Sequence, residues 1–254
     1  MLRGDAVRSQ ARSGLLTGPT CGLAPGYLQA NLVIVTRDLA FDFLLFCQRN
    51  PKPCPILDVL DPGTWQPRGV ANGADIRTDL PRYRVYERGA LVEEPPEIVR
   101  WWRNDLVTFL LGCSFSFEAA MQRAGLPVRH IEEGRNVPMY RTNIPCTPAG
   151  RFAGPLVVTM RPLTPAQAIE AAVITSRFPQ AHGSPVHCGD PHAIGIADLT
   201  RPDFGEAVTV RAGEVPVFWA CGVTPQAVVM EAKPEIAVTH SPGCMFVTDR
   251  LAEQ

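Results

Sequence analysis

The sequence has very little lysine, no long apolar run and no block of like charge. Among 254 residues, lysine occurs only at Lys52 and Lys233, each directly before a proline. A Schiff-base lysine needs a dry pocket and a mobile side chain, so pyridoxal-phosphate chemistry is not expected. The formal net charge is −1. No basic stretch is long enough to predict nucleic-acid binding.

Features of membrane and secreted proteins are also missing. The richest apolar stretches, 28–35 and 106–111, are far shorter than the roughly 20 residues that a membrane-spanning helix requires. The N-terminal residues contain several arginines and lack the apolar centre of a secretory signal. The eight cysteines are scattered without C-x-x-C spacing, which is typical of free thiols in a reducing compartment. These features predict a cytoplasmic protein with no membrane partner.

The motifs of common cofactors are absent. The chain contains no G-x-G-x-x-G, no G-x-x-x-x-G-K-[ST] and no H-E-x-x-H. A Rossmann-type dinucleotide site, a P-loop and a zincin-type zinc site are therefore unsupported. We predict chemistry that needs no cofactor.

Proline is abundant, with 25 residues, about twice the usual share of about 5%. Rigid, irregular loops are therefore expected, and such loops commonly carry functional sites. Helices are predicted at 1–13, 37–48, 97–111, 116–123 and 165–178, and short strand-like runs, including 228–230, dominate after residue 180. We predict an α/β fold: a mixed three-layer α/β body from residues 1–125 and 182–254, with a smaller inserted α+β domain at 126–181.

The first candidate site is the turn that leads into the helix predicted at 116–123. A helix N-terminus favours an anion, so Ser114 and Ser116 are candidates for binding a substrate carboxylate. Glu118 would lie in the first turn and could act as a base. The alternative is structural: either serine caps the helix and Glu118 complements the helix dipole.

The second candidate lies at residues 139–146, at the end of a predicted strand. Arg141 can grip a carboxylate with two parallel hydrogen bonds, and Asn143 can donate to an oxyanion. A strand end with ordinary solvent-exposed polar side chains explains the same residues equally well.

The third candidate is the loop 182–192, which holds three histidines, a cysteine and an aspartate. His187 beside Asp190 could shuttle a proton, because imidazole titrates near neutral pH. His182 and Ser184 could contact the substrate. The histidine spacing matches no common zinc pattern, so no metal is predicted. Loop residues that hydrogen-bond the backbone are the alternative.

Two further candidates follow predicted strands, where α/β proteins often bind ligands. Cys221 and Gly222 end the strand predicted at 215–220, and Cys221 could be a nucleophile if a protonated histidine lowered its pKa. A buried inert thiol is the commoner outcome. His240 ends the strand predicted at 236–239.

Long motifs in this sequence resemble one family. They lie at 17–20, 25–31, 41–55, 75–83, 112–118, 140–143, 182–187, 218–226 and 239–243. Over nearly the whole chain the sequence resembles the bacterial hydro-lyases of the D-glutamate cyclase-like family, and the vertebrate mitochondrial D-glutamate cyclase contains a similar domain. The resemblance implies a three-layer α/β domain with a smaller α+β domain. It also implies a reaction that joins the amine of D-glutamate to its side-chain carboxylate, expels water and needs no redox cofactor.

The resemblance leads to a prediction of a hydro-lyase that acts on a small amino or carboxylic acid, such as D-glutamate cyclised to 5-oxo-D-proline. The predicted roles are a carboxylate clamp of Arg141, Ser114 and Ser116, a base at Glu118 or Asp190, an acid at His187 or His240, and oxyanion donors at Asn143 and the Gly222 N–H. A homo-oligomer is compatible with the sequence. The alternatives are a non-catalytic small-carboxylate-binding protein and a Cys221-dependent or metal-dependent hydrolase of a small acid or amide.

Overall fold

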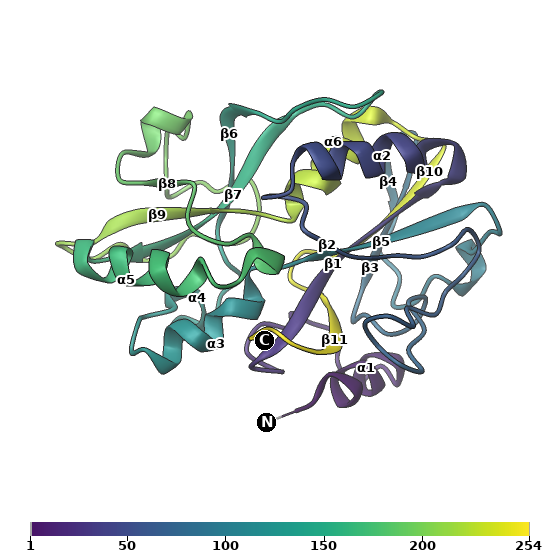
Figure 1. The fold of residues 1–254 in the computed structure, drawn as a ribbon, viewed down its shortest axis with the longest axis horizontal. Helices are drawn as coiled ribbons and strands as arrows, with labels where there is room; N and C mark the ends of the chain where they lie inside the picture. The colour runs from purple at the N-terminus through teal and green to yellow at the C-terminus, as the bar shows by residue number, and fades with distance from the viewer. Residues whose placement is uncertain (1, 254) are drawn as a thin grey trace.

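Two antiparallel β-sheets organise the chain, and the computed structural model describes residues 2–253 (Figure 1). The first sheet has the strand order β2-β5-β1-β10-β3-β4, and β11 also pairs with β1. Its strands are β1 (Tyr27–Thr36), β2 (Ile56–Val59), β3 (Tyr83–Glu87), β4 (Ala90–Glu93), β5 (Leu106–Gly112), β10 (Ile236–His240) and β11 (Phe246–Leu251).

The second sheet has the order β6-β7-β9-β8. Its strands are β6 (Met139–Pro145), β7 (Pro155–Leu163), β8 (His187–Cys188) and β9 (Val215–Ala220). The segment 126–181, expected as a smaller domain, supplies β6 and β7. Residues 187–220 complete the sheet, because the apolar strand β9 pairs along β7 from Val215 opposite Leu163 to Ala220 opposite Val158.

Helices lie on both sides of the sheets. Figure 1 shows α2 and α6 along the upper side of the drawing and α1, α3 and α4 along the lower side. The helices are α1 (Gly4–Arg12), α2 (Arg37–Arg49), α3 (Phe115–Arg123), α4 (Arg129–Glu132), α5 (Pro165–Thr175) and α6 (Val223–Ala232), with 3₁₀ turns η1 (Val99–Trp101), η2 (Pro179–Ala181) and η3 (Pro191–Ile194). The predicted α/β class is confirmed.

The helix predicted at 97–111 is wrong. Only the short turn η1 forms there, and residues 106–112 form β5. This strand lies between β2 and β1, and all of its residues are buried. A strand covered on both faces shows an unbroken apolar run instead of alternation, so its periodicity resembles that of a buried helix.

The strand predicted at 228–230 is also wrong, because these residues lie inside α6. Val228 and Val229 are buried, and the β-branched side chains gave the strand-like signal. Pro225 falls in the first turn of this helix, where a missing N–H costs nothing. Helix α6 packs against β7 of the second sheet and against β1 and β10 of the first. It therefore starts where the two sheets meet.

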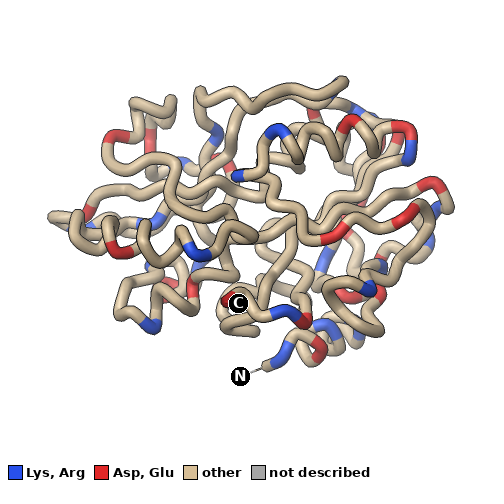
Figure 2. Tube along the Cα trace, viewed as in Figure 1, with Lys and Arg blue, Asp and Glu red and all other residues tan. Residues whose placement is uncertain are grey.

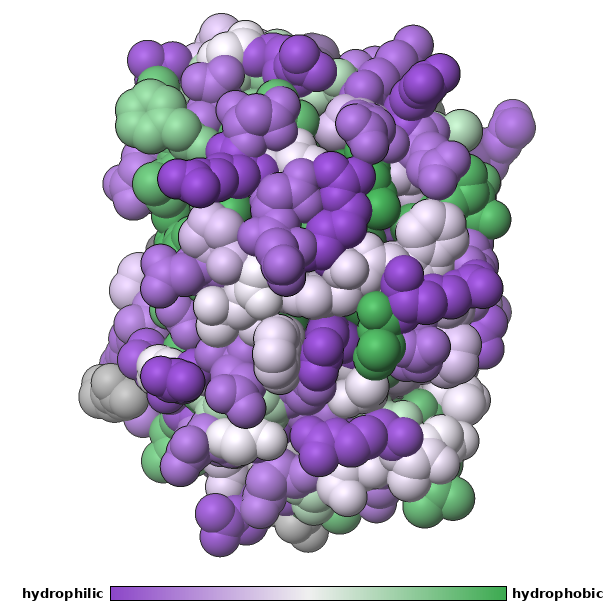
Figure 3. Space-filling view, turned by 90° about the vertical axis from the view of Figure 1, so that its right-hand side faces the viewer, coloured by the Kyte–Doolittle hydropathy of each residue, from purple (hydrophilic) through white to green (hydrophobic). Residues whose placement is uncertain are grey.

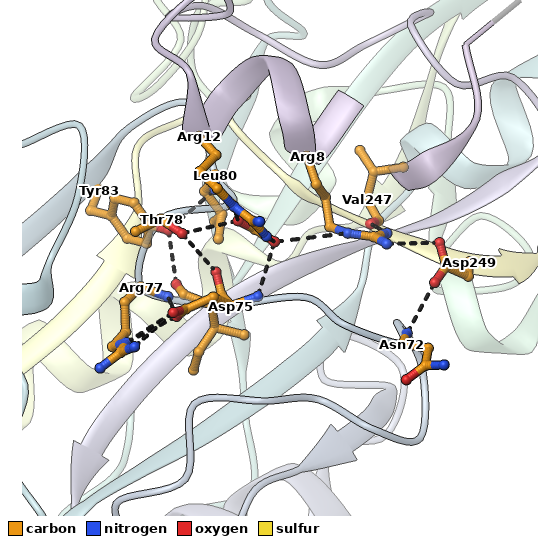
Figure 4. A network of polar contacts seen from close by, with 12 residues as sticks. Arg8, Arg12, Asn72, Asp75, Arg77, Thr78, Leu80, Tyr83, Val247 and Asp249 are labelled. Carbon is orange, nitrogen blue, oxygen red and sulfur yellow. Dashed lines mark hydrogen bonds and ion pairs between the residues drawn. The ribbon is translucent and has the colours of Figure 1, made fainter. Parts of the chain in front are cut away.

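Helix α1 is attached to the body by buried charges (Figure 4). Arg12 donates two hydrogen bonds of 2.7 Å to the Asp79 carboxylate. Arg8 donates to the carbonyl of Val247 at 2.7 Å and to Asp249 at 2.9 Å. The side chain of Asp79 is fully buried and that of Arg8 is 4% exposed. The helix is therefore attached through a carboxylate that water does not reach.

Replacing Asp79 with asparagine should destabilise the fold by about 1.5–3 kcal/mol, because hydrogen bonds to a charged group are lost at a buried position. Chemical denaturation measures this directly. Asp105→Asn is the matched control, since the Arg103–Asp105 pair is exposed and exposed ion pairs contribute little. Equal stability losses in the two variants would contradict the role given to Asp79.

Charged residues of both signs are interspersed over the chain (Figure 2). The face shown in Figure 3 is mainly hydrophilic, and its apolar side chains form small separate groups. Within residues 2–253, no helix has the length and apolar character needed to cross a membrane.

Candidate functional site

A small cavity lies where the two sheets meet. Side chains from β1, β7 and β10, the starts of α3 and α6, and the loops before β6 and after η2 form its walls. Its polar lining includes Asn31, Ser114, Asn136, Thr159, His182 and His240, and the backbone of Gly222 adds to it. Segments that are far apart in the sequence therefore converge on one space.

The cavity volume is about 20 Å³, which is room for little more than one water molecule. A larger ligand therefore requires the walls to move. Met139 and Met245 form part of the lining, and their unbranched side chains repack more easily than most apolar residues.

His182 lines this cavity and has one ring nitrogen without a partner among the described residues. Its Nδ1 lies 2.8 Å from the carbonyl oxygen of Lys52, and a carbonyl can only accept, so Nδ1 carries the proton. Nε2 is buried and has no partner within residues 2–253. Burial lowers the pKa of His182 to about 4, and the nearby Arg161 and Lys52 charges act in the same direction. At neutral pH, Nε2 therefore holds an unused lone pair.

Two more observations indicate that the residues lining this cavity form a binding site. His182 has a φ of 76°, which is left-handed and unusual for a residue with a side chain. Asn136 Oδ1 is also buried without a partner in the described part of the chain. Buried polar atoms are nearly always hydrogen-bonded, so two unpartnered atoms in the lining of one cavity point to a missing ligand.

His240 is held in the complementary tautomer. The backbone N–H of Leu32 donates to Nδ1 at 3.1 Å, so the proton of the neutral ring is on Nε2. The amide nitrogen of Gln226 lies 2.9 Å from Nδ1 and 3.0 Å from Nε2. Burial lowers the pKa of His240 to about 4. The cavity thus contains His182, whose Nε2 can accept a proton, and His240, whose Nε2–H requires the Gln226 side-chain amide to present its oxygen.

The N-termini of α3 and α6 both border the cavity. The dipole of each helix favours an anion there, although Cys221 already accepts the Val223 and Thr224 N–H groups of α6 and Pro225 has no N–H. Gly222 precedes α6 and packs against Asn31 so closely that a Cβ there would lie 2.0 Å from Asn31 Nδ2. Asn31 in turn donates to the carbonyl of Gly112 at 2.7 Å. Only glycine at 222 allows this approach of α6 to β1.

Glu118 lies behind this lining in a buried charge cluster. Arg161 Nη2 donates to its Oε1, and His130 Nε2 lies 3.1 Å from the same oxygen. Burial alone would raise the pKa of the Glu118 carboxyl, but His130 and Arg161 outweigh it, and the pKa is lowered. Glu118 is therefore an ion-pair partner that stays charged at neutral pH. Its Oε1 is already shared by Arg161 and His130, and it does not line the cavity, so it is not positioned to take a proton from a ligand there.

Two thiols complete the lining. Burial raises the pKa of Cys221 to about 11 and raises the pKa of Cys113 further. Cys221 Sγ accepts the backbone N–H of Val223 at 3.5 Å. Both thiols are protonated at neutral pH, whereas a nucleophilic cysteine needs the thiolate.

Five of the residues predicted as site residues line the cavity: Ser114, His182, Cys221, Gly222 and His240. Glu118 does not line it and lies behind Ser114, where Arg161 bonds to both residues. Ser116 is buried but faces β1, where its Oγ accepts the backbone N–H of Gln29 at 2.9 Å.

The other predicted residues lie on the two edges of the second sheet. Arg141 and Asn143 belong to the edge strand β6 and are exposed, and the Arg141 guanidinium lies 5.6 Å from the ring centroid of Phe204. His187 belongs to the opposite edge strand, β8. Arg141 and His187 therefore do not share a site with each other or with the cavity.

Ser184 and His187 line a separate groove between α5 and β8, with a volume of about 640 Å³ and mainly apolar walls. His187 Nε2 already lies 2.7 Å from the carbonyl of Asp190. The Asp190 carboxylate accepts the backbone N–H of His192 at 3.0 Å. These polar groups are occupied by local hydrogen bonds.

Sequence reasoning missed Thr159, Arg161 and His130. A signal was present in β7, because Thr159 and Arg161 follow Val157 at a spacing of two in a buried, otherwise apolar strand. Residues at this spacing share one face of a strand. Polar side chains on a buried face need specific partners. His130 gives no comparable signal, since it is a lone histidine in a short helix.

Metal ligands are not gathered anywhere in the described residues. No group of three or more histidine, cysteine, aspartate or glutamate side chains within 2–253 is arranged to hold a metal ion.

Comparison with known proteins identifies relatives over the full chain. The family profile described as D-glutamate cyclase matches residues 107–249. A protein of Stutzerimonas stutzeri named "Putative hydro-lyase" is 63% identical over 249 residues, 98% of this chain and 94% of the relative. A protein from Bacillus licheniformis with the same designation is 63% identical over 253 residues, 100% of this chain and 97% of the relative. One from Bordetella pertussis is 63% identical over 248 residues, 98% of this chain and 90% of the relative.

Among solved structures, a nitrogen repressor-like protein from Methanococcus jannaschii covers 100% of both chains with a TM-score of 0.41 and 9% sequence identity. This likeness is too weak to support an argument about fold or function.

Proposed function

This chain belongs to the D-glutamate cyclase family, and from that membership we propose that it is a hydro-lyase whose active site is the cavity around His182. The proposed substrate is a small amino acid with a second carboxylate. The proposed reaction is the cyclisation of D-glutamate to 5-oxo-D-proline with loss of water.

The observation that carries this proposal is the unpartnered Nε2 of His182 in a cavity bordered by two helix N-termini. An ammonium group can fill the empty acceptor positions at His182 Nε2 and Asn136 Oδ1. A carboxylate is favoured by the dipole at the N-terminus of α3. Both ends of an amino acid therefore find complementary groups in one space, as a cyclisation that depends on proximity requires.

The proposed reaction balances without an external reagent. The substrate nitrogen attacks the side-chain carboxyl carbon, the C–N bond forms and one C–O bond breaks. The ammonium gives up two protons in total, and the departing oxygen takes up two and leaves as water. In this scheme His182 Nε2 accepts a proton from the ammonium, and His240 Nε2–H donates towards the leaving oxygen after it parts from the Gln226 side-chain amide.

Incubation of the purified protein with D-glutamate, followed by chromatographic detection of 5-oxo-D-proline, tests the proposal. L-glutamate and D-aspartate in parallel reactions define the stereochemistry and chain length. We expect product formation above the uncatalysed rate together with an increase in Tm on adding D-glutamate. Binding without turnover of any of these acids would overturn the enzymatic function and leave a carboxylate-binding protein.

A further inference from the structure

We infer that Arg161 orients the hydroxyl groups of Ser114 and Thr159 as a pair of donors, and that this pair binds the non-reacting carboxylate of the substrate. The inference rests on the proposed function, because it assigns the carboxylate end of the same cavity. Arg161 is a positioning residue in this scheme, and the two hydroxyls contact the ligand.

The geometry of Arg161 fixes the direction of both hydroxyls. Its Nη1 donates to Thr159 Oγ1 at 3.1 Å, and its Nη2 donates to Ser114 Oγ at 3.2 Å. A guanidinium has no acceptor, so both oxygens accept and neither can donate back to Arg161. Each hydroxyl proton must therefore point to another partner.

Residues 2–253 supply no such partner. Neither hydroxyl donates a hydrogen bond to any atom of residues 2–253. Ser114 and Thr159 both line the cavity, and both are buried, with 3% and 1% of their surface exposed. Two O–H donors without acceptors thus face the same enclosed space, and a ligand with paired oxygens satisfies both.

Arg161 is itself held rigidly. Its Nη2 also donates to Glu118, and its guanidinium lies 5.2 Å from the ring centroid of Phe117 and 5.4 Å from that of Trp219. Arg161 is 1% exposed. Because Glu118 compensates its charge, Arg161 acts on the ligand through the oriented hydroxyls and not as a direct ion-pair partner.

The ligand class follows from this lining. A carboxylate accepts from two donors at once, whereas an amide at the same place brings an NH₂ group that would face a second donor. The N-terminus of α3 adds a favourable field for negative charge. The site therefore discriminates a carboxylate from the corresponding amide at this end of the substrate.

Thr159→Val in the full chain tests the inference, because it removes the hydroxyl and keeps the shape. We expect KM for D-glutamate, and its Kd by calorimetry, to rise about tenfold or more with a smaller change in kcat, as a lost hydrogen bond to a charged group implies. Thr159→Ser should restore most of the affinity. Thr108→Val is the matched control. Thr108 lies outside the cavity, and its buried Oγ1 has no partner among residues 2–253, so the KM of this variant should match wild type.

A second ligand separates carboxylate recognition from general loss of binding. D-isoglutamine carries an amide in place of the α-carboxylate. Wild type should bind it at least tenfold more weakly than D-glutamate, and Thr159→Val should largely abolish that preference. Arg161→Lys keeps the positive charge but lacks the planar guanidinium whose two nitrogens hold the two hydroxyls, and it should resemble Thr159→Val if circular dichroism shows that it folds.

The outcomes distinguish this inference from the proposed function. Turnover in wild type with an unchanged KM and an unchanged amide preference in Thr159→Val overturns the inference and leaves the enzymatic function standing. D-glutamate binding without turnover removes the function, and the Thr159→Val affinity still decides the carboxylate subsite. Absence of both binding and turnover in wild type overturns both.

Discussion

Replacing His182 with glutamine is expected to lower kcat by about 10²–10⁴-fold, the usual contribution of a positioned proton acceptor. Glutamine is similar in size and its NH₂ group can still donate to the Lys52 carbonyl, which His182 Nδ1 contacts at 2.8 Å. It has no basic nitrogen to take the place of Nε2. Steady-state kinetics with D-glutamate measures the loss, and circular dichroism verifies the fold.

His187→Gln is the control for this experiment. His187 is half-buried in a different groove and its Nε2 is already close to the Asp190 carbonyl. Its substitution should change kcat less than threefold. A large loss in His187→Gln with full activity in His182→Gln would move the active site to the groove between α5 and β8.

Acidification is expected to destabilise the fold between about pH 6.5 and pH 4. An unfolded histidine has a pKa near 6.5, whereas burial lowers the folded pKa of His182 and of His240 to about 4. The unfolded chain then binds more protons, so the free energy of unfolding falls as pH falls. Each ring contributes a loss of about 2 kcal/mol between pH 7.5 and pH 5, or about 4 kcal/mol together.

Charged groups near the two histidine rings contribute to the pH range over which stability is lost. Arg161 and Lys52 act on His182, and Arg84 acts on His240, all lowering the histidine pKa. Glu118 has a lowered pKa and adds a loss of stability only below about pH 4.5, where its unfolded form becomes protonated.

Denaturant unfolding at pH 7.5, 6, 5 and 4.5 measures this dependence. His240→Gln should reduce the loss between pH 7.5 and pH 5 by about half, since one titrating ring remains. His192→Gln is the control, because His192 is exposed, and it should follow wild type. Stability that stays constant down to pH 5 would show that the two rings are not buried in their neutral forms.

The sequence predicted elements well where local signals agree. The helix predicted at 165–178 was confirmed as α5, which ends at Thr175; Thr164 and Gln167 form its capping box, and Pro165 is its first residue. Prediction from the sequence failed at β5, where burial on both faces removed the alternation that identifies a strand. It also failed at α6, where packing against both sheets outweighed the strand preference of Val228 and Val229.

The candidate site was predictable only in part, for a similar reason. Histidines and cysteines beside Gly and Pro marked the turns at 112–114, 182, 221–222 and 240, which all border the cavity. The sequence could not show that β6 and β8 occupy opposite edges of one sheet. From the sequence, Arg141 and His187 therefore seemed as suitable for the site as the residues that line the cavity, although the fold places both of them away from it.

Diffraction from crystals of the protein grown with 5-oxo-D-proline or D-glutamate tests the location of the site most directly. We predict ligand density between His182 and the starts of α3 and α6, with its nitrogen next to His182 Nε2, a carboxylate on the Ser114 and Thr159 hydroxyls, and displaced Met139 or Met245 side chains. Ordered ligand in the groove beside His187, with the cavity unchanged, would contradict the account.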